Sequence, residues 1–271
     1  MPLRYVAIGD SLSEGVGDTP WPDGTPRGWT DRLAARLATH HGGIEYANLA
    51  VRGYRIRQIV QAQRDAAAAL APDYVTVTAG MNDLLRPRPD FDTLHSDLVA
   101  LVEPFHRSGT PMVFVPIPDL RRITPVSRLL ERNRVRLNDV YRDLAAHHGV
   151  HPITDTTGTV FEDPRAWGDD HLHLTPLGHA RLAQAAADLF GMPGSGGWAP
   201  PPAGPVPRAT VRSEARWARE HLVPWVGRRL RGASSGDGRG AKSPRPRPVA
   251  GGIDGTLYYR TRLENEAAGR C

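Results

Sequence analysis

The first 190 residues alternate short apolar runs with longer segments whose apolar residues recur every three or four positions. The apolar runs predict β-strands at residues 5–8, 44–48, 74–78, 112–116 and 150–154. The longer segments predict helices at residues 29–41, 56–71, 92–107, 126–148 and 176–190. Strands that alternate with helices in this way predict an α/β fold, a five-stranded parallel sheet covered by helices.

The pattern changes after Gly191, where Gly, Pro, Ser and Arg dominate. Segments 193–197 and 243–248 contain too few apolar residues to be expected to order themselves. Between them, apolar residues recur at helical spacing over 211–231, and Pro224 is expected to break or kink that helix. We therefore predict a domain at residues 1–192 and a C-terminal extension at residues 193–271.

The composition is that of a globular protein, because 271 residues with 40% hydrophobic content can build a sizeable core. Cys271 is the only cysteine, so an intrachain disulfide framework is excluded. The chain begins without a basic and apolar leader and has no apolar run of transmembrane length. These features predict a cytoplasmic protein.

The net charge of +5 is concentrated in the C-terminal part of the chain. Residues 191–271 hold 14 Lys+Arg and 6 Asp+Glu, whereas residues 1–190 hold 20 Lys+Arg and 23 Asp+Glu. This near-neutral charge implies no anionic partner for the predicted domain.

Three interpretations of the C-terminal extension compete. We favour docking of segment 211–231 on the domain, because Trp217 and Trp225 add apolar area to it. A weak contact with an anionic membrane surface is the second, and an inert extension is the third. Specific nucleic-acid binding ranks last, because arginine-rich tails bind polyanions without specificity. The arginines that suit lipid headgroups are Arg212, Arg216, Arg219, Arg228, Arg229 and Arg231.

Ser11 is a candidate nucleophile because the sequence Gly-Asp-Ser-Leu-Ser at 9–13 directly follows the first predicted strand. Backbone amides of the turn after a strand can stabilise an oxyanion beside such a serine. The alternative is a serine that only caps the turn, which is the commoner role of Asp-Ser pairs.

Asp170 and His173 are candidates for an activating pair. An Asp three residues before a His can accept the imidazole Nδ1 proton, which leaves Nε2 free to deprotonate a serine. The alternatives are a surface pair or a metal site formed with Asp169 and His171, although no known zinc spacing supports a metal.

Two further segments follow the second and third predicted strands. Residues 48–53 offer the Gly53 amide and residues 79–83 offer the Asn82 side chain, both neutral donors suited to an oxyanion. Taken singly, these residues also fit a turn glycine and a capping asparagine.

Together these four segments, within residues 4 to about 190, resemble the four sequence blocks of the Ser-Gly-Asn-His (SGNH), or GDSL, hydrolases. The resemblance implies a flavodoxin-like three-layer α/β/α sandwich and a serine esterase, lipase or acyltransferase without metal or cofactor. It assigns Ser11 as nucleophile, His173 as base and Asp170 as its orienting group. It also implies an oxyanion hole made by the Ser11 amide, the Gly53 amide and the Asn82 side chain. Segments 9–18 and 217–239 look most like actinobacterial members.

The resulting hypothesis is hydrolysis of a short-chain or carbohydrate-borne ester through a Ser11 acyl-enzyme. The alternatives are an acyltransferase of the same fold and a non-catalytic module that binds anionic surfaces. Trp21 and Trp29 are expected either to line the substrate pocket or to pack their loop on the domain, and loop 119–125 is a second possible wall. The oligomeric state stays open.

Several nearby residues are predicted to have other roles. Asp10 is expected to bond the turn around Ser11, and Asp169 and His171 are expected to be bystanders. His179 is expected to be a core or capping histidine. The sequence Gly-Ala-Ser-Ser-Gly at 232–236 matches the G-x-S-x-G pattern, but no strand precedes it, so we do not assign it a nucleophile.

Overall fold

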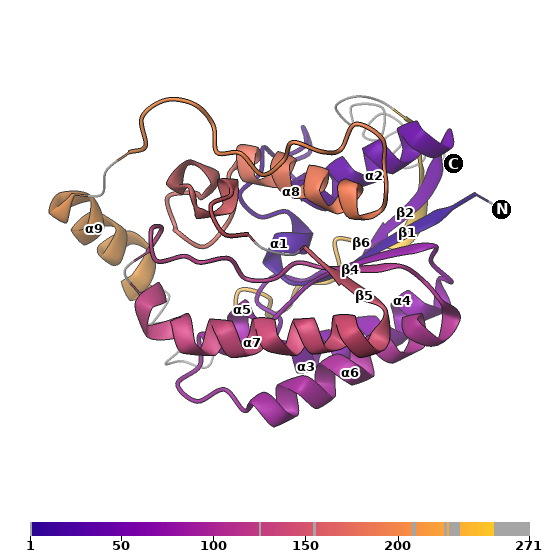
Figure 1. Cartoon of the computed structure of the whole chain (residues 1–271), viewed down its shortest axis with the longest axis horizontal. Coiled ribbons are helices and arrows are strands. Elements are labelled where there is room, and N and C mark those ends of the chain that lie inside the picture. The colour runs from indigo at the N-terminus through magenta and orange to yellow at the C-terminus, as the bar shows by residue number, and fades with distance from the viewer. Residues whose placement is uncertain are drawn as a thin grey trace.

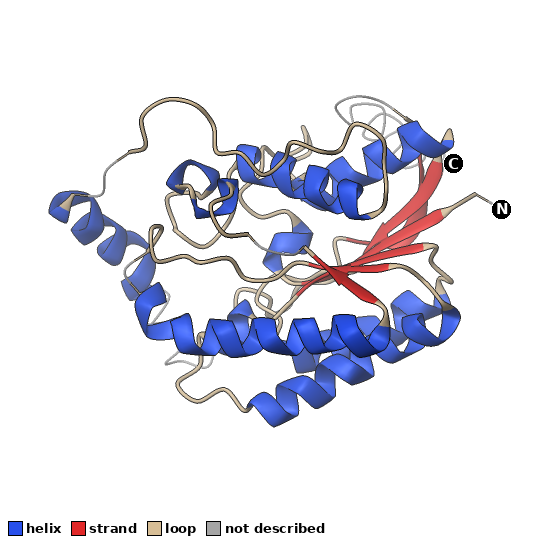
Figure 2. Ribbon diagram, in the orientation of Figure 1, coloured by secondary structure: helices blue, strands red, loops and turns tan. Residues whose placement is uncertain are grey.

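A computed structural model describes residues 2–124, 126–153, 156–207, 210–224, 227 and 234–251. The described residues form one six-stranded sheet between two layers of helices (Figures 1 and 2). This three-layer α/β/α arrangement confirms the predicted fold class. Among the described residues, no helix is long and apolar enough to cross a membrane.

Five strands of the sheet are parallel and agree with the predicted strands. They are β1 (Arg4–Gly9), β2 (Ile44–Asn48), β3 (Tyr74–Thr78), β4 (Met112–Phe114) and β5 (Val150–Pro152). Their order across the sheet is β5-β4-β3-β1-β2. This is the flavodoxin-like order, in which the chain reverses its direction of progress between β1 and β3.

Helices cover both faces of the sheet, as Figures 1 and 2 show. One layer contains α2 (Gly28–His41) and α8 (Pro176–Leu189), which pack on each other. The other contains α3 (Ile56–Ile59), the π-helix η1 (Val60–Arg64), α4 (Asp65–Ala69), α6 (Phe91–Ser108) and α7 (Ser127–His148). The apolar stripes of these helices and the strands enclose one buried core.

Short helices that the sequence pattern did not predict lie around the carboxyl ends of the strands. They are α1 (Ser11–Glu14), α5 (Met81–Leu84), and the 3₁₀ turns η2 (Val160–Glu162) and η3 (Pro164–Ala166). Segments of three or four residues are too short to show a helical period.

The C-terminal extension contributes a sixth strand, β6 (Ser243–Val249), which pairs antiparallel with β2. The prediction that residues 243–248 do not order is therefore wrong. Pro248 lies opposite Glu45, whose amide donates to the Leu3 carbonyl on the β1 side, so the missing N–H of Pro248 belongs to the outer side of β6. That side is the free edge of the sheet, where proline is tolerated.

The predicted helix at 211–231 begins as expected. It contains α9 (Val211–Trp217) and the π-helix η4 (Ala218–Leu222), and the helical conformation reaches Pro224. Thr210 caps it by accepting a hydrogen bond from the Ser213 amide at 3.1 Å. Trp225 and Arg228, Arg229 and Arg231 lie outside the described residues. The boundary at residue 192 stays a prediction.

Candidate active site

Ser11 lies at the end of β1, beside the point where the strand order reverses. Gly9 makes this turn possible, because it has φ +133° and a Cβ there would collide with the backbone of Thr78. Ser11 is the first residue of α1, so its amide has no acceptor within that helix. The serine is therefore presented where open α/β sheets bind ligands.

Asp10 holds this turn in place, as its predicted structural role requires. Its carboxylate accepts hydrogen bonds from the Leu12 amide and the Thr78 hydroxyl, both at 3.2 Å, and from the Asn82 side chain at 3.3 Å. Burial raises the pKa of Asp10 to about 6, although these hydrogen bonds favour the ionised form.

Asp170 and His173 form the pair that their spacing predicts. His173 Nδ1 lies 2.5 Å from Asp170 Oδ2, and Asp170 Oδ1 accepts the amides of Leu172 and His173 at 3.0 Å each. Burial opposes the charge on Asp170, but the His173 side chain and the two amides outweigh it and lower the pKa of Asp170 to about 2. The aspartate is thus ionised at neutral pH and fixes the imidazole so that Nε2 points away from it.

Gly53 and Asn82 also lie at this edge of the sheet. The loop before Gly53 is tied to α1, because the Arg52 amide donates to Glu14 Oε2 at 2.7 Å and the Arg52 guanidinium binds Oε1 at 2.5 Å. Asn82 Nδ2 donates to the Tyr54 carbonyl at 3.0 Å. These bonds fix both predicted oxyanion donors relative to Ser11.

Two cavities meet at Ser11 and His173. The inner pocket has a volume of about 70 Å³ and is mostly apolar. Its apolar lining includes Val115, Ile117, Ile153, Phe161, Trp167, Leu172, Leu174 and Leu182. The outer cleft has a volume of about 360 Å³ and more polar groups. Its lining includes Gly53, Leu120, Thr124, Ser127, Asp170, His171, Trp217, Glu220, His221 and Ser235.

The expectations for the cavity walls had different outcomes. Loop 119–125 does form a wall, since Leu120 and Thr124 line the outer cleft. Trp21 and Trp29 are instead buried in the core, which confirms the alternative that they pack their loop on the domain.

His179 is a core histidine, as expected. It is fully buried, its Nδ1 accepts the Trp29 amide at 3.1 Å, and its Nε2 lies 3.0 Å from the Val16 carbonyl. Burial lowers the pKa of His179 to about 4, so the ring is neutral at pH 7.

A metal centre at Asp169, Asp170, His171 and His173 has no support in the geometry. In the part of the chain that the structure describes, no group of three or more His, Cys, Asp or Glu side chains is arranged to hold a metal ion.

Sequence reasoning missed the contribution of the C-terminal extension to the outer cleft. Trp217, Glu220, His221 and Ser235 come from it. The sequence indicates Trp217 only as apolar area, and its hydrogen bond to Asp170 confirms that this part of segment 211–231 docks on the domain. Arg212, Arg216 and Arg219 are exposed, and binding of an anionic surface by them stays a prediction.

Comparison with solved structures identifies enzymes of similar fold. An α/β hydrolase, LAE5, from the metagenome of Lake Arreo in Spain has a TM-score of 0.59 at 20% identity, covering 70% of this chain and 95% of that one. The acetylxylan esterase Axe2 from Geobacillus stearothermophilus has a TM-score of 0.56 at 19% identity, covering 70% and 94%. Catalytic mutants of Axe2 replace a serine, an aspartate or a histidine by alanine.

Comparison of sequences agrees with the fold. The uncharacterized protein YpmR of Bacillus subtilis is 32% identical over 115 residues, which are 40% of this chain and 41% of YpmR. The chain thus matches about two fifths of that relative's length. Residues 7–181 match the GDSL-like lipase/acylhydrolase family, and this match includes Ser11, Gly53, Asn82, Asp170 and His173. With a match over most of its length, the chain belongs to the GDSL-like lipase/acylhydrolase family.

Proposed function

We propose that this protein is a serine hydrolase of carboxylic esters with short acyl groups. The observation that carries the proposal is the Asp170–His173 pair, joined at 2.5 Å, beside a cavity that Ser11 and His173 both line. Membership of the GDSL-like family supports ester hydrolysis. The Axe2 variants support the roles of serine, aspartate and histidine by analogy.

In the proposed mechanism, Ser11 Oγ attacks the ester carbonyl while His173 Nε2 takes the hydroxyl proton. The Ser11 and Gly53 amides and Asn82 Nδ2 stabilise the oxyanion of the tetrahedral intermediate. The bond from Asn82 to Asp10 is long, at 3.3 Å, so we assign this N–H, which is held more weakly than the one on the Tyr54 carbonyl, to the oxyanion.

Collapse of this intermediate breaks the bond to the alcohol, which leaves with the proton from His173. The acyl group then remains on Ser11. Water attacks the acyl-enzyme, gives a proton to His173 Nε2, and releases the acid when that proton returns to Ser11 Oγ. Asp170 stays ionised throughout and stabilises the imidazolium that forms in each half of the cycle.

The two cavities suit the two parts of an ester. The inner pocket is apolar, as an acyl chain requires, and about 70 Å³ is far below the roughly 300–1,000 Å³ of sites for drug-sized ligands. The outer cleft offers Ser127, His221 and Ser235 as polar groups for an alcohol or sugar. We therefore assign the acyl group to the inner pocket and the alcohol to the outer cleft.

The test is hydrolysis of p-nitrophenyl esters from acetate to palmitate by the wild type, Ser11→Ala and His173→Ala. We expect acetate and butyrate to react faster than palmitate, both variants to lose activity, and EDTA to have no effect. Ser96→Ala and His95→Ala are matched controls, because His95 forms a half-buried His–Asp pair with Asp143 at 2.9 Å, between helices α6 and α7 and away from both cavities. Activity that survives in Ser11→Ala, or disappears with EDTA, contradicts the proposal. Faster product formation with an added alcohol acceptor would indicate the acyltransferase alternative.

A further inference from the structure

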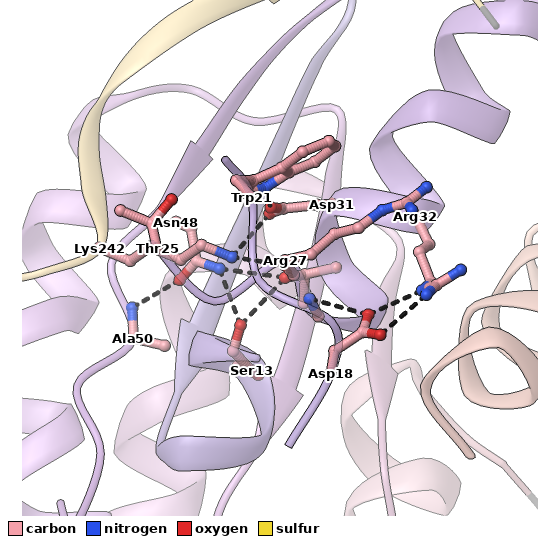
Figure 3. A network of polar contacts seen from close by, with 12 residues as sticks. Ser13, Asp18, Trp21, Thr25, Arg27, Asp31, Arg32, Asn48, Ala50 and Lys242 are labelled. Atoms are coloured by element: carbon pink, nitrogen blue, oxygen red, sulfur yellow. Dashed lines mark hydrogen bonds and ion pairs between the residues drawn. The ribbon is translucent and has the colours of Figure 1, made fainter. Parts of the chain in front are cut away.

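The C-terminal extension is fixed to the domain on both sides of the segment that reaches the outer cleft. Trp198, near its start, packs against the core, and β6, near its end, pairs with β2. Lys242, directly before β6, enters a buried polar network (Figure 3). Its Nζ lies 2.9 Å from Asp31 Oδ1 and 2.6 Å from the Arg27 carbonyl. The described part of the extension is therefore packed on the domain as part of its tertiary structure.

The extension contacts both loops of the proposed catalytic machinery. Ser234, Ser235 and Gly236 pack so closely on Gly53 that a Cβ at Gly53 would collide with them. At the other loop, the Trp217 indole N–H donates to the Asp170 carbonyl at 3.1 Å.

The Trp217 ring also stacks on His171. The ring centroids are 5.1 Å apart and the planes are inclined by only 16°. Trp217 therefore holds the Asp170–His173 turn by two independent contacts, one to its backbone and one to a side chain.

His171 has a backbone conformation that needs such support. Its φ is +57°, and among the described residues only Ala71 is another non-glycine with positive φ. Side chains with a Cβ are strained in this region and persist there only when their surroundings hold them. The same turn brings the Leu172 and His173 amides to Asp170 Oδ1 at 3.0 Å each.

From these contacts we infer that Trp217 is a positioning residue for the Asp170–His173 pair, so that the C-terminal extension completes the active site. The inference rests on the proposed ester-hydrolase function. Trp217 acts through Asp170 and His171 rather than on the reacting atoms. Loss of its contacts lets the turn relax and moves His173 away from Ser11.

The experiment compares Trp217→Ala, which loses both contacts, with Trp217→Phe, which keeps a ring for stacking but loses the N–H. We expect Trp217→Ala to lower kcat for p-nitrophenyl acetate on the order of 10- to 100-fold, because small misplacements of catalytic groups are costly. Trp217→Phe should lose about threefold, as expected for one hydrogen bond. KM should rise less than kcat falls, because only the p-nitrophenyl group reaches the outer cleft that Trp217 lines, whereas the acetyl group contacts the inner pocket.

Trp198→Phe is the matched control. It also removes an indole N–H from the extension, here bonded to Asp188 at 3.3 Å, and it keeps the ring beside Phe161. We expect it to behave like the wild type. Thermal unfolding of all three variants shows whether the fold is retained. If Trp217→Ala does not fold, the kcat of Trp217→Phe still tests the inference.

A second readout reports on Ser11 without ester binding. The rate of Ser11 labelling by a fluorophosphonate should fall in Trp217→Ala by the same factor as kcat. Folded Trp217 variants with wild-type kcat and labelling rate would overturn the inference alone, as would a loss confined to KM. A wild-type protein that neither hydrolyses esters nor labels at Ser11 would overturn the proposed function, and the inference with it.

Discussion

The predicted domain at residues 1–192 and the C-terminal extension both line the outer cleft, but different interactions hold them in place. The domain is held by a continuous apolar core between sheet and helices. The described part of the extension relies mainly on strand pairing, a buried ion pair and the contacts of single aromatic rings. An apolar core spreads its stabilisation over many residues and tolerates many substitutions. A hydrogen bond or ion pair depends on single residues and is lost when one of them is replaced. We therefore expect substitutions of catalytic residues in the domain to lower kcat most, and substitutions in the extension to lower it less.

Asp170→Asn is expected to lower kcat more than any other substitution, and it represents the domain in the comparison. An asparagine keeps the shape but stabilises the wrong imidazole tautomer, so kcat should fall by about 10⁴-fold with the fold intact. Steady-state kinetics on p-nitrophenyl acetate measures it. Asp143→Asn, which removes the partner of the surface His95, should leave kcat unchanged. A loss no larger than that of Trp217→Ala would mean that the domain and the extension contribute equally.

Lys242→Met tests the buried ion pair of the extension. Asp31 would be left buried without this cation, although Trp21 Nε1 and the Tyr46 hydroxyl still donate to it at 2.8 Å each. We expect the free energy of unfolding to fall by about 3 kcal/mol, the lower end for breaking a buried pair. Denaturant unfolding measures this, with the exposed Arg245→Met as control. Equal stability of the two variants would show that the ion pair does not anchor the extension.

His179 makes the stability of the domain depend on pH. Its pKa is about 4 in the fold and about 6.5 in the unfolded chain, so acidification protonates the unfolded chain first. The stabilisation by neutral His179 is thus full above pH 6.5 and decreases as the pH falls toward 4. Buried Asp10 and Asp83, whose pKa values burial raises to about 6, act in the opposite direction over pH 4 to 6.

The contribution of His179 is isolated by comparing the wild type with His179→Asn. The difference in unfolding free energy should shrink by about 2 kcal/mol between pH 7 and pH 5. Denaturant unfolding at both pH values measures it. A difference that does not change with pH would mean that His179 is not held neutral.

Arg247→Pro gives the smallest expected effect and tests the pairing of β6. Pro248 lies opposite Glu45 and has no N–H, so the next pair, Arg247 with Tyr46, is the hydrogen-bonded one. Proline at 247 should therefore cost about 1 kcal/mol, whereas Arg247→Ala keeps the N–H and should cost less. Denaturant unfolding separates the two variants, and equal losses would show that only the arginine side chain matters.

The sequence predicted the elements with a local signal well. Strand β2 and strand β3 were predicted with their observed bounds, and helices α2, α6 and α7 to within one residue at each end. The predicted positions of Ser11, Gly53 and Asn82 after their strands follow from the same pattern, because parallel strands end at one edge of the sheet.

Strand β6 was missed because its composition is that of an unstructured segment. Its three prolines are acceptable because β6 is an edge strand, and an edge strand exists only relative to β2. Trp217 shows the same limit, since its helix was predicted but its bond to the Asp170 carbonyl was not.

The sequence by itself determined the alternation of strands and helices in the domain and the placement of Ser11, Gly53 and Asn82 after their strands, because the hydrophobic period and the succession of elements along the chain are local properties. The tertiary structure alone decided that the C-terminal extension returns to this edge and lines the outer cleft. Its contacts join residues far apart in the chain, such as Lys242 with Asp31 and Trp217 with Asp170, and such pairs leave no periodic pattern in the sequence.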